Sequence, residues 1–451
     1  MRADLRLAWL LTRGSDRREW WRAALTALGA ALATGIGFAI AVLTSMDGYY
    51  SVSVGSGLLD SASDRLNVSV ALGLLLIPVL GFLGQCARIG AVHRDRRLAA
   101  LRLAGATPWQ TRRIAALESG LACLAGAVPA AAVAVPLLPH LWRHPAPAAW
   151  AGIALVAVAV PLLGAAVSAL ALRRVVASPL GRVRRSRPTR APGRLFRAAT
   201  WLLATTALVI LVGPVLSDSP LFALGPVAVV VLALLLSCTA VWLTGSSSRQ
   251  LGEGLAARTR RPAVLIAAER LREDPWAAAR THAGVLLVTV LISGFAGVRQ
   301  VLLAELHRRG EGSLSAPLSY YTTGLDLTAT AILVGLALVL TALAVGTAES
   351  LATRRRGLAA QVAAGVPRAV LAWALLLETA LPLAPAVAVA GVGGFAIGAW
   401  YASLSSATVV APTPYLPLLV PVAVYAACLL AAACSLPLLR RSVRPAELRY
   451  A

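Results

Sequence analysis

The sequence contains no lysine, so all 42 of its basic side chains are arginines. This absence excludes a Walker A lysine, a Schiff-base lysine and a kinase-type phosphate-binding lysine. If the protein depends on ATP, another chain must therefore hydrolyse it.

Charged residues are also scarce, at 14% of the chain against about 25% in an ordinary soluble domain. Hydrophobic residues make up 58%, and the mean hydropathy is +0.76. A soluble protein of this composition could not cover its own surface. The composition therefore predicts an all-α polytopic membrane protein.

Residues that could carry independent chemistry are few and scattered. The five cysteines lie in apolar runs without CxxC spacing, which indicates packed hydrophobic side chains. Among the histidines only His140 and His144 are spaced like metal ligands, and no third ligand is evident. No nucleophile, paired-carboxylate or phosphate-loop motif stands out, so we expect no catalytic residue, no metal site and no enzyme activity in this chain.

About ten apolar stretches are long enough to cross a hydrocarbon layer of ~30 Å. These predicted spans cover residues 23–45, 67–87, 114–138, 148–172, 198–216, 221–244, 283–304, 327–348, 370–399 and 416–439.

The arginines are distributed unevenly between the connecting segments. Of the 42, 37 lie in alternate segments, namely 1–22, 88–113, 173–197, 245–282, 349–369 and 440–451. This positive-inside pattern predicts that both termini are cytoplasmic. It also explains the net charge of +23 by membrane topology and lipid contact, so no nucleic-acid partner is expected. Arg299, near the outer end of its span, is expected to snorkel to the interface.

A weak internal repeat appears when the sequence is shifted by 260 residues. Residues 94–118 then lie over 354–378, and nine of 25 positions are identical, including Gly105 with Gly365 and Glu118 with Glu378. The span pattern follows the same shift. It predicts a first four-span repeat at 1–172, a basic segment with a two-span linker at 173–261, and a second four-span repeat at 262–451. The two repeats should have the same orientation in the membrane.

The repeated segment has the features of a short helix followed by a membrane-entering helix. Residues 98–104 are strong helix formers flanked by arginines, Gly105 suits a helix stop, and Thr107 with Pro108 suits a new helix start. Residues 354–369 repeat the scheme with Gly365 and Pro367. The segment is either an ordinary interfacial connector or an element that carries motion between a cytoplasmic partner and the membrane.

This segment resembles the corresponding segment of the FtsX-like permease family. The resemblance rests on the run of basic residues, on Leu-Ala-Ala-Leu-Arg-x-x-Gly-Ala-Thr at 98–107 and on Leu-Glu at 117–118. Members of the family are the membrane subunits of MacB-type, mechanotransmitting (type VII) ABC transporters, and the ten-span plan is similar to their duplicated form. Residues 354–378 depart from the pattern at Gln361, Val362 and Pro367.

The resemblance implies a permease in a bacterial cytoplasmic membrane that works with a separate cytoplasmic ATPase, normally a pair of subunits that hold ATP and Mg²⁺. The short inner helices would be its coupling helices. The residues that take this role are Arg94, Arg96, Leu98, Ala99, Arg102 and Gly105 in the first copy, and Arg356, Leu358, Ala359 and Gly365 in the second.

The outer loops Met46–Arg65 and about Glu305–Asp326 are short compared with the large outer domain found in many family members. We therefore expect export or extraction of a small amphipathic, peptide or lipid-like substrate by mechanotransmission. The alternatives are a secondary transporter driven by an ion gradient and a regulatory membrane protein that transports nothing.

Glu118 and Glu378 are the acids that lie well inside predicted spans. Neither has an arginine three or four residues away, so each must face water, pair with another segment, or stay protonated. They are candidates for a conformational latch near the ATPase-facing side, or else are structural membrane-entry residues.

Overall fold

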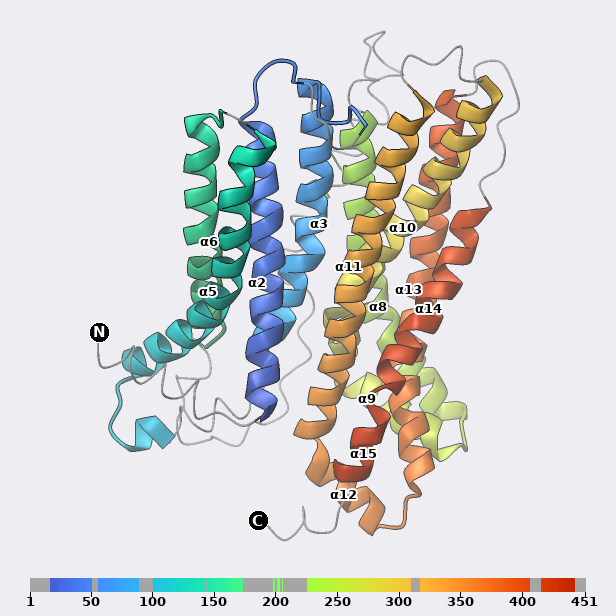
Figure 1. The fold of residues 1–451 in the computed structure, drawn as a ribbon. Coiled ribbons are helices and arrows are strands. Elements are labelled where there is room, and N and C mark those ends of the chain that lie inside the picture. Colours follow the sequence, from blue (N-terminus) through green and yellow to red (C-terminus); the bar gives the residue numbers. More distant parts are fainter. Residues whose placement is uncertain are drawn as a thin grey trace. The chain divides into compact units, whose positions relative to one another are not determined.

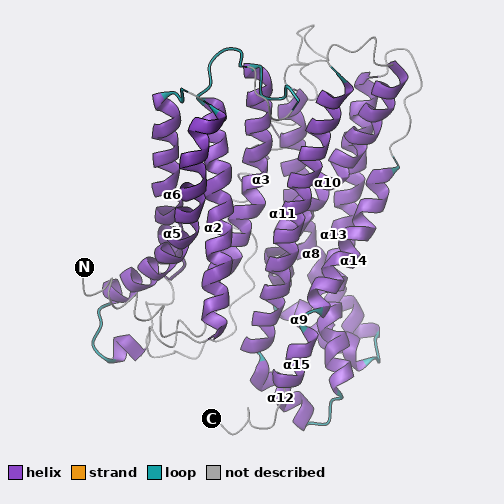
Figure 2. Cartoon of the chain, in the orientation of Figure 1, coloured by secondary structure: helices purple, strands orange, loops and turns teal. Residues whose placement is uncertain are grey.

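All the elements described in the computed structural model are helices, which confirms the all-α prediction (Figure 2). The structure describes residues 17–50, 56–88, 100–142, 144–172, 198, 201–202, 205, 225–309, 317–405 and 415–442. Nine of the described helices are long and apolar enough to cross a membrane. The predicted span 198–216 lies outside the described residues except for 198, 201–202 and 205.

The chain divides into two compact units, Met1–Ser186 and Arg187–Ala451 (Figure 1). The first unit contains four long helices: α2 (Arg17–Thr44), α3 (Ala62–Arg88), α5 (Pro108–Leu141) and α6 (Pro147–Leu172). Within it, α2 packs against the other three helices, and α5 packs against α6.

The second unit repeats this packing with helices displaced by about 260 residues in the sequence. Its corresponding helices are α10 (Pro275–Arg309), α11 (Leu318–Thr353), α13 (Arg368–Ser405) and α14 (Leu416–Ala433). Here α10 packs against the other three helices and α13 against α14. These four helices therefore pack in the same pairs in each of the two units.

Four further helices are described in the second unit. They are α8 (Gly225–Arg258), α9 (Pro262–Glu273), α12 (Arg355–Ala363) and α15 (Leu436–Ser442). The long α8 packs against α10 and α13, and α9 turns back to pack against α8 and α13. Figure 1 shows α9, α12 and α15 toward the same end of this unit, which we call its arginine-rich end because α9 carries Arg270 and Arg272 and α12 carries Arg355 and Arg356.

Small residues bring α10 and α13 close together. A Cβ added to Gly394 would overlap the Ser293 side chain, and one added to Gly297 would lie 2.9 Å from the Cα atom of Gly398. Since Gly394 and Gly398 form a GxxxG spacing, the two backbones can approach without intervening side chains. This pair of helices forms a tightly packed centre for the second unit.

One sequence expectation about the connection between α10 and α11 is corrected. The predicted loop at about Glu305–Asp326 is shorter, because α10 continues to Arg309 and α11 begins at Leu318. Arg299 lies within α10 and forms an ion pair with α11, since its Nη2 atom is 2.9 Å from Oδ1 of Asp326.

Arg65 organises the segment between α2 and α3. It is only 1% exposed, and its guanidinium donates to the backbone carbonyls of Leu59, Asp60, Met46 and Gly48 at 2.5–3.0 Å. The ring of Tyr50 lies 5.6 Å from the Arg65 Cζ atom. Arginine has enough donors in a fixed fork to hold several carbonyls at once, so this side chain holds residues 46–48 and 59–60 together.

Candidate functional site

The predicted inner helix of the second repeat is present as α12, and its two faces differ. Leu358 and Ala359 are 1% and 3% exposed, and Leu358 packs with Leu351, Leu371 and Leu439. Arg356 lies on the exposed face. The structure therefore separates the predicted residues: Leu358 and Ala359 fix α12 to the bundle, and Arg356 faces outward.

Gly365 ends α12 in the way the sequence predicts. Its φ of +92° lies in the left-handed region that glycine adopts without strain. The Gly365 N–H donates to the Val362 carbonyl, and the Val366 N–H donates to the Gln361 carbonyl, both at 3.0 Å. These two bonds form a Schellman-type stop, and α13 begins three residues later at Arg368.

The first repeat has the same stop at Gly105, with a φ of +96°. The Gly105 N–H donates to the Arg102 carbonyl and the Ala106 N–H to the Leu101 carbonyl, again at 3.0 Å. Thr107 then caps α5 through a reciprocal pair of bonds with Gln110, at 3.2 and 2.8 Å. Arg102 is half-buried just before this turn. The other residues assigned to this coupling helix lie outside the described residues: Arg94, Arg96, Leu98 and Ala99.

Glu378 pairs with arginines from two other segments, which settles one of the alternatives left open by the sequence. Its Oε1 atom bonds to Arg270 on α9, and its Oε2 atom lies 3.1 Å from Nη1 of Arg354, the N-cap residue of α12. The Glu378 and Arg270 side chains are only 18% and 20% exposed, while Arg354 is 44% exposed. The carboxylate of Glu378 thus links α13, α9 and the start of α12.

Glu118 occupies the matching place in the first repeat, ten residues after the start of α5 as Glu378 is ten after the start of α13. It is 8% exposed. Under the same shift of 260 residues, Leu10 lies over Arg270.

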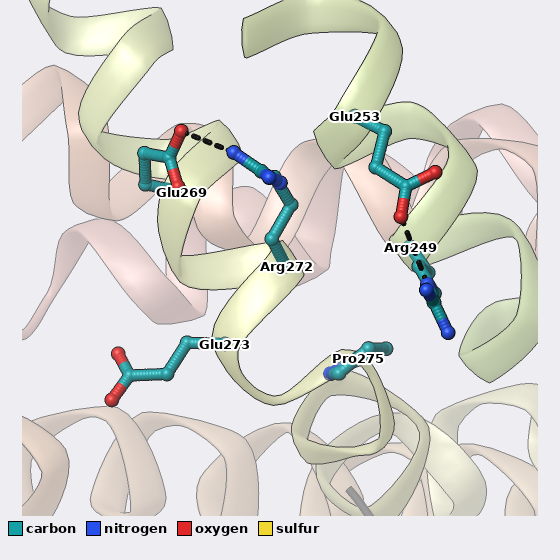
Figure 3. Close-up of a pocket in the computed structure, with 6 residues that line it drawn as sticks. All are labelled: Arg249, Glu253, Glu269, Arg272, Glu273 and Pro275. Atoms are coloured by element: carbon teal, nitrogen blue, oxygen red, sulfur yellow. Dashed lines mark hydrogen bonds and ion pairs between the residues drawn. The ribbon is translucent and has the colours of Figure 1, made fainter.

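A polar cavity of about 400 Å³ lies between α8, α9 and the start of α10. It is lined by Arg249, Glu253, Glu269, Arg272, Glu273 and Pro275 (Figure 3). Gly252 allows the close approach of α8 to α9, because a Cβ there would lie 2.8 Å from the Ala268 carbonyl oxygen. Sequence reasoning missed this site, and the available signal was the mixture of acids and arginines at 249–280.

No group of three or more His, Cys, Asp or Glu side chains that could hold a metal ion occurs among the described residues. The cysteines are all in the thiol form, and Cys434 is the exposed member of the five.

Comparison with known proteins gives one match. Residues 68–180 match the family model described as FtsX-like permease C-terminal. This region includes most of α3, all of α5 and α6, and the Gly105 turn. No curated protein and no solved structure matches the chain significantly.

Proposed function

We propose that this multi-pass FtsX-like permease, identified by its domain at residues 68–180, transmits force within an ABC transporter. Its partner is a separate cytoplasmic ATPase present in two copies, which holds ATP and Mg²⁺. The output is export or extraction of a small amphipathic, peptide or lipid-like compound from a bacterial cytoplasmic membrane.

The single observation that carries this proposal is the construction around α12. This short helix is fixed to the bundle by Leu358, ends at Gly365, and is followed at once by the membrane-crossing α13. Its Arg356 is exposed at the arginine-rich end. Only the short turn at Gly365 separates α12 from α13. A displacement of α12 therefore moves α13 directly.

The Glu378 ion pairs extend this rigid connection. Because Arg354 precedes α12 and Arg270 lies on α9, displacement of α12 also acts on α9 through one carboxylate. The pair with Arg270 has limited exposure and is costly to break, so α13 and α9 move together, and the more exposed pair with Arg354 adds a weaker link to α12. The close contact of α10 with α13 at Gly394 then passes the movement to the far end of the unit.

The absence of lysine supports the assignment of ATP hydrolysis to another chain. The short connections at the opposite end support a small or membrane-embedded substrate. There, only residues 45–61 separate α2 from α3, and only residues 310–317 separate α10 from α11.

The proposal is tested by purifying the tagged full-length chain from its native membrane in mild detergent and assaying ATP hydrolysis. We expect an ATPase to co-purify with the wild-type chain and to be depleted about tenfold by Arg356→Glu. Arg309→Glu, an exposed arginine at the opposite end of α10, is the matched control and should retain the ATPase. Absence of an ATPase after gentle crosslinking, or full retention in Arg356→Glu, would overturn the proposal.

A further inference from the structure

The polar cavity between α8 and α9 is lined by more acidic than basic side chains. Two arginines and three glutamates line it, in a chain whose overall charge is +23. Arg249 pairs with Glu253 at 2.9 Å and Arg272 with Glu269 at 2.6 Å. The carboxylate left over is that of Glu273.

Glu273 also occupies an unfavourable place in its own helix. It is the last residue of α9, where the helix macrodipole favours a cation, and Asp274 follows as the C-cap. Asp274 is compensated by Arg280 at 2.5 Å. Within the described part of the chain Glu273 has no ion pair, and Figure 3 draws no interaction between it and the other residues of the cavity.

The arginines nearest to Glu273 in the sequence are already engaged. Arg270, one turn earlier, bonds to Glu378, and Arg272 bonds to Glu269. The pairs of Arg249 and Arg272 are exposed and therefore weak, so both can rearrange around an incoming group. The cavity is thus complementary to one additional cationic side chain.

We infer that this cavity receives an arginine or lysine of the cytoplasmic ATPase subunit, whose cationic group pairs with Glu273. The inference rests on the proposed function and adds a contact beyond the α12 helix. The ATPase is the expected donor because α9 is tied to the start of α12 by Arg270, Glu378 and Arg354. Figure 1 also shows α9 and α12 toward the same end of the unit, so a partner seated on α12 approaches the end at which α9 lies.

The contact should fasten the ATPase to α9 as well as to α12. Glu378 joins both α9 and α12 to α13. An ATPase attached to both helices would therefore move the same membrane helix from two points. Electrostatic contacts of this kind chiefly set specificity and association rate.

The test uses the full-length chain co-expressed with the ATPase and compares Glu273→Arg, Glu273→Gln and Glu349→Gln. Glu349 on α11 lies outside the cavity and serves as the control for loss of a carboxylate near the arginine-rich end. We expect the dissociation constant of the ATPase to rise about tenfold with Glu273→Arg, two- to fivefold with Glu273→Gln, and less than twofold with Glu349→Gln.

A photo-crosslinking amino acid at position 273 identifies the neighbour directly. A crosslink to the ATPase within a few residues of an arginine or lysine supports the inference, and reversal of that residue to glutamate should restore binding to Glu273→Arg. A crosslink to another protein, or to residues of this chain itself, would overturn it.

The outcome also separates this inference from the proposed function. If the ATPase binds and Arg356→Glu releases it while Glu273→Arg does not, the cavity assignment alone is wrong. If no ATPase binds the wild-type chain, both are wrong.

Discussion

Gly105 and Gly365, 260 residues apart, adopt the same left-handed conformation and close the same pair of backbone hydrogen bonds. Each ends a short helix directly before a long helix that carries a glutamate of low exposure ten residues from its start. The repeated geometry indicates that the turn is a fixed part of both repeats.

Gly365→Val should strain the turn between α12 and α13. A β-branched residue is a steric outlier at this φ, and the left-handed conformation costs about 1–2 kcal/mol. We expect a lower unfolding temperature in detergent and weaker ATPase association. The matched control is Gly357→Ala within α12, where φ is not positive and a Cβ meets nothing within 4 Å. It should be neutral or stabilising, by up to about 1 kcal/mol, and equal behaviour of the two variants would contradict the strained-turn account.

The two ion pairs of Glu378 should differ in strength. Arg270 is 20% exposed and Arg354 is 44% exposed, so solvent screens the second pair more. Double-mutant cycles with Glu378→Gln should give a coupling free energy of about 1–3 kcal/mol for Arg270→Ala and roughly 0.5 kcal/mol for Arg354→Ala. Denaturant unfolding in detergent measures both. A larger coupling for Arg354 would show that the link to α9 is secondary.

Gly394→Leu should disrupt the contact of α10 with α13. The added side chain meets Ser293 and the backbone of Gly294, and overpacking of this kind costs about 1–3 kcal/mol. Gly346→Leu, on α11 where a Cβ meets nothing within 4 Å, is the control of equal chemistry. Thermal unfolding should separate the two variants by several degrees, and similar midpoints would mean that this contact contributes little.

Arg65→Lys should loosen the connection between α2 and α3 although it keeps the positive charge. Lysine places three donors at one point and cannot reproduce the fork that reaches four carbonyls. We expect a loss of about 1–3 kcal/mol and faster protease cleavage at residues 46–61. The control is Arg309→Lys, an exposed arginine paired with Glu305. Unchanged cleavage in Arg65→Lys would exclude an ordering role for this side chain.

The sequence predicts most of the local structure, because its signals are local. Hydrophobic length predicts the spans, and glycine predicts the stops at Gly105 and Gly365. Thr107 and Pro108 predict the start of α5. Helix ends are less well predicted, since α8 and α11 continue past their apolar runs into polar sequence.

Contacts between distant segments are not encoded in such local signals. The sequence shows that Glu378 needs a partner outside its own helix, but the choice of Arg270, 108 residues away, depends on how α9 packs. The burial of Leu358 and the presence of the cavity beside Glu273 depend in the same way on tertiary packing. The sequence therefore indicates the candidate segment at α12. Only the structure shows that Leu358 and Ala359 are buried and that Arg356 is exposed.

The central claim, that α12 drives rearrangement at the opposite end of the second unit, is tested most directly by a distance measurement. Spin labels would replace Ser319 at the start of α11 and Tyr415 at the start of α14, both exposed, after replacement of the exposed Cys434. The complex with the ATPase would be measured by pulsed electron paramagnetic resonance with and without a non-hydrolysable ATP analogue. The account predicts that the analogue shifts the distance distribution, and that Arg356→Glu abolishes the shift. An unchanged distribution in the wild-type complex, or a shift that persists in Arg356→Glu, would contradict it.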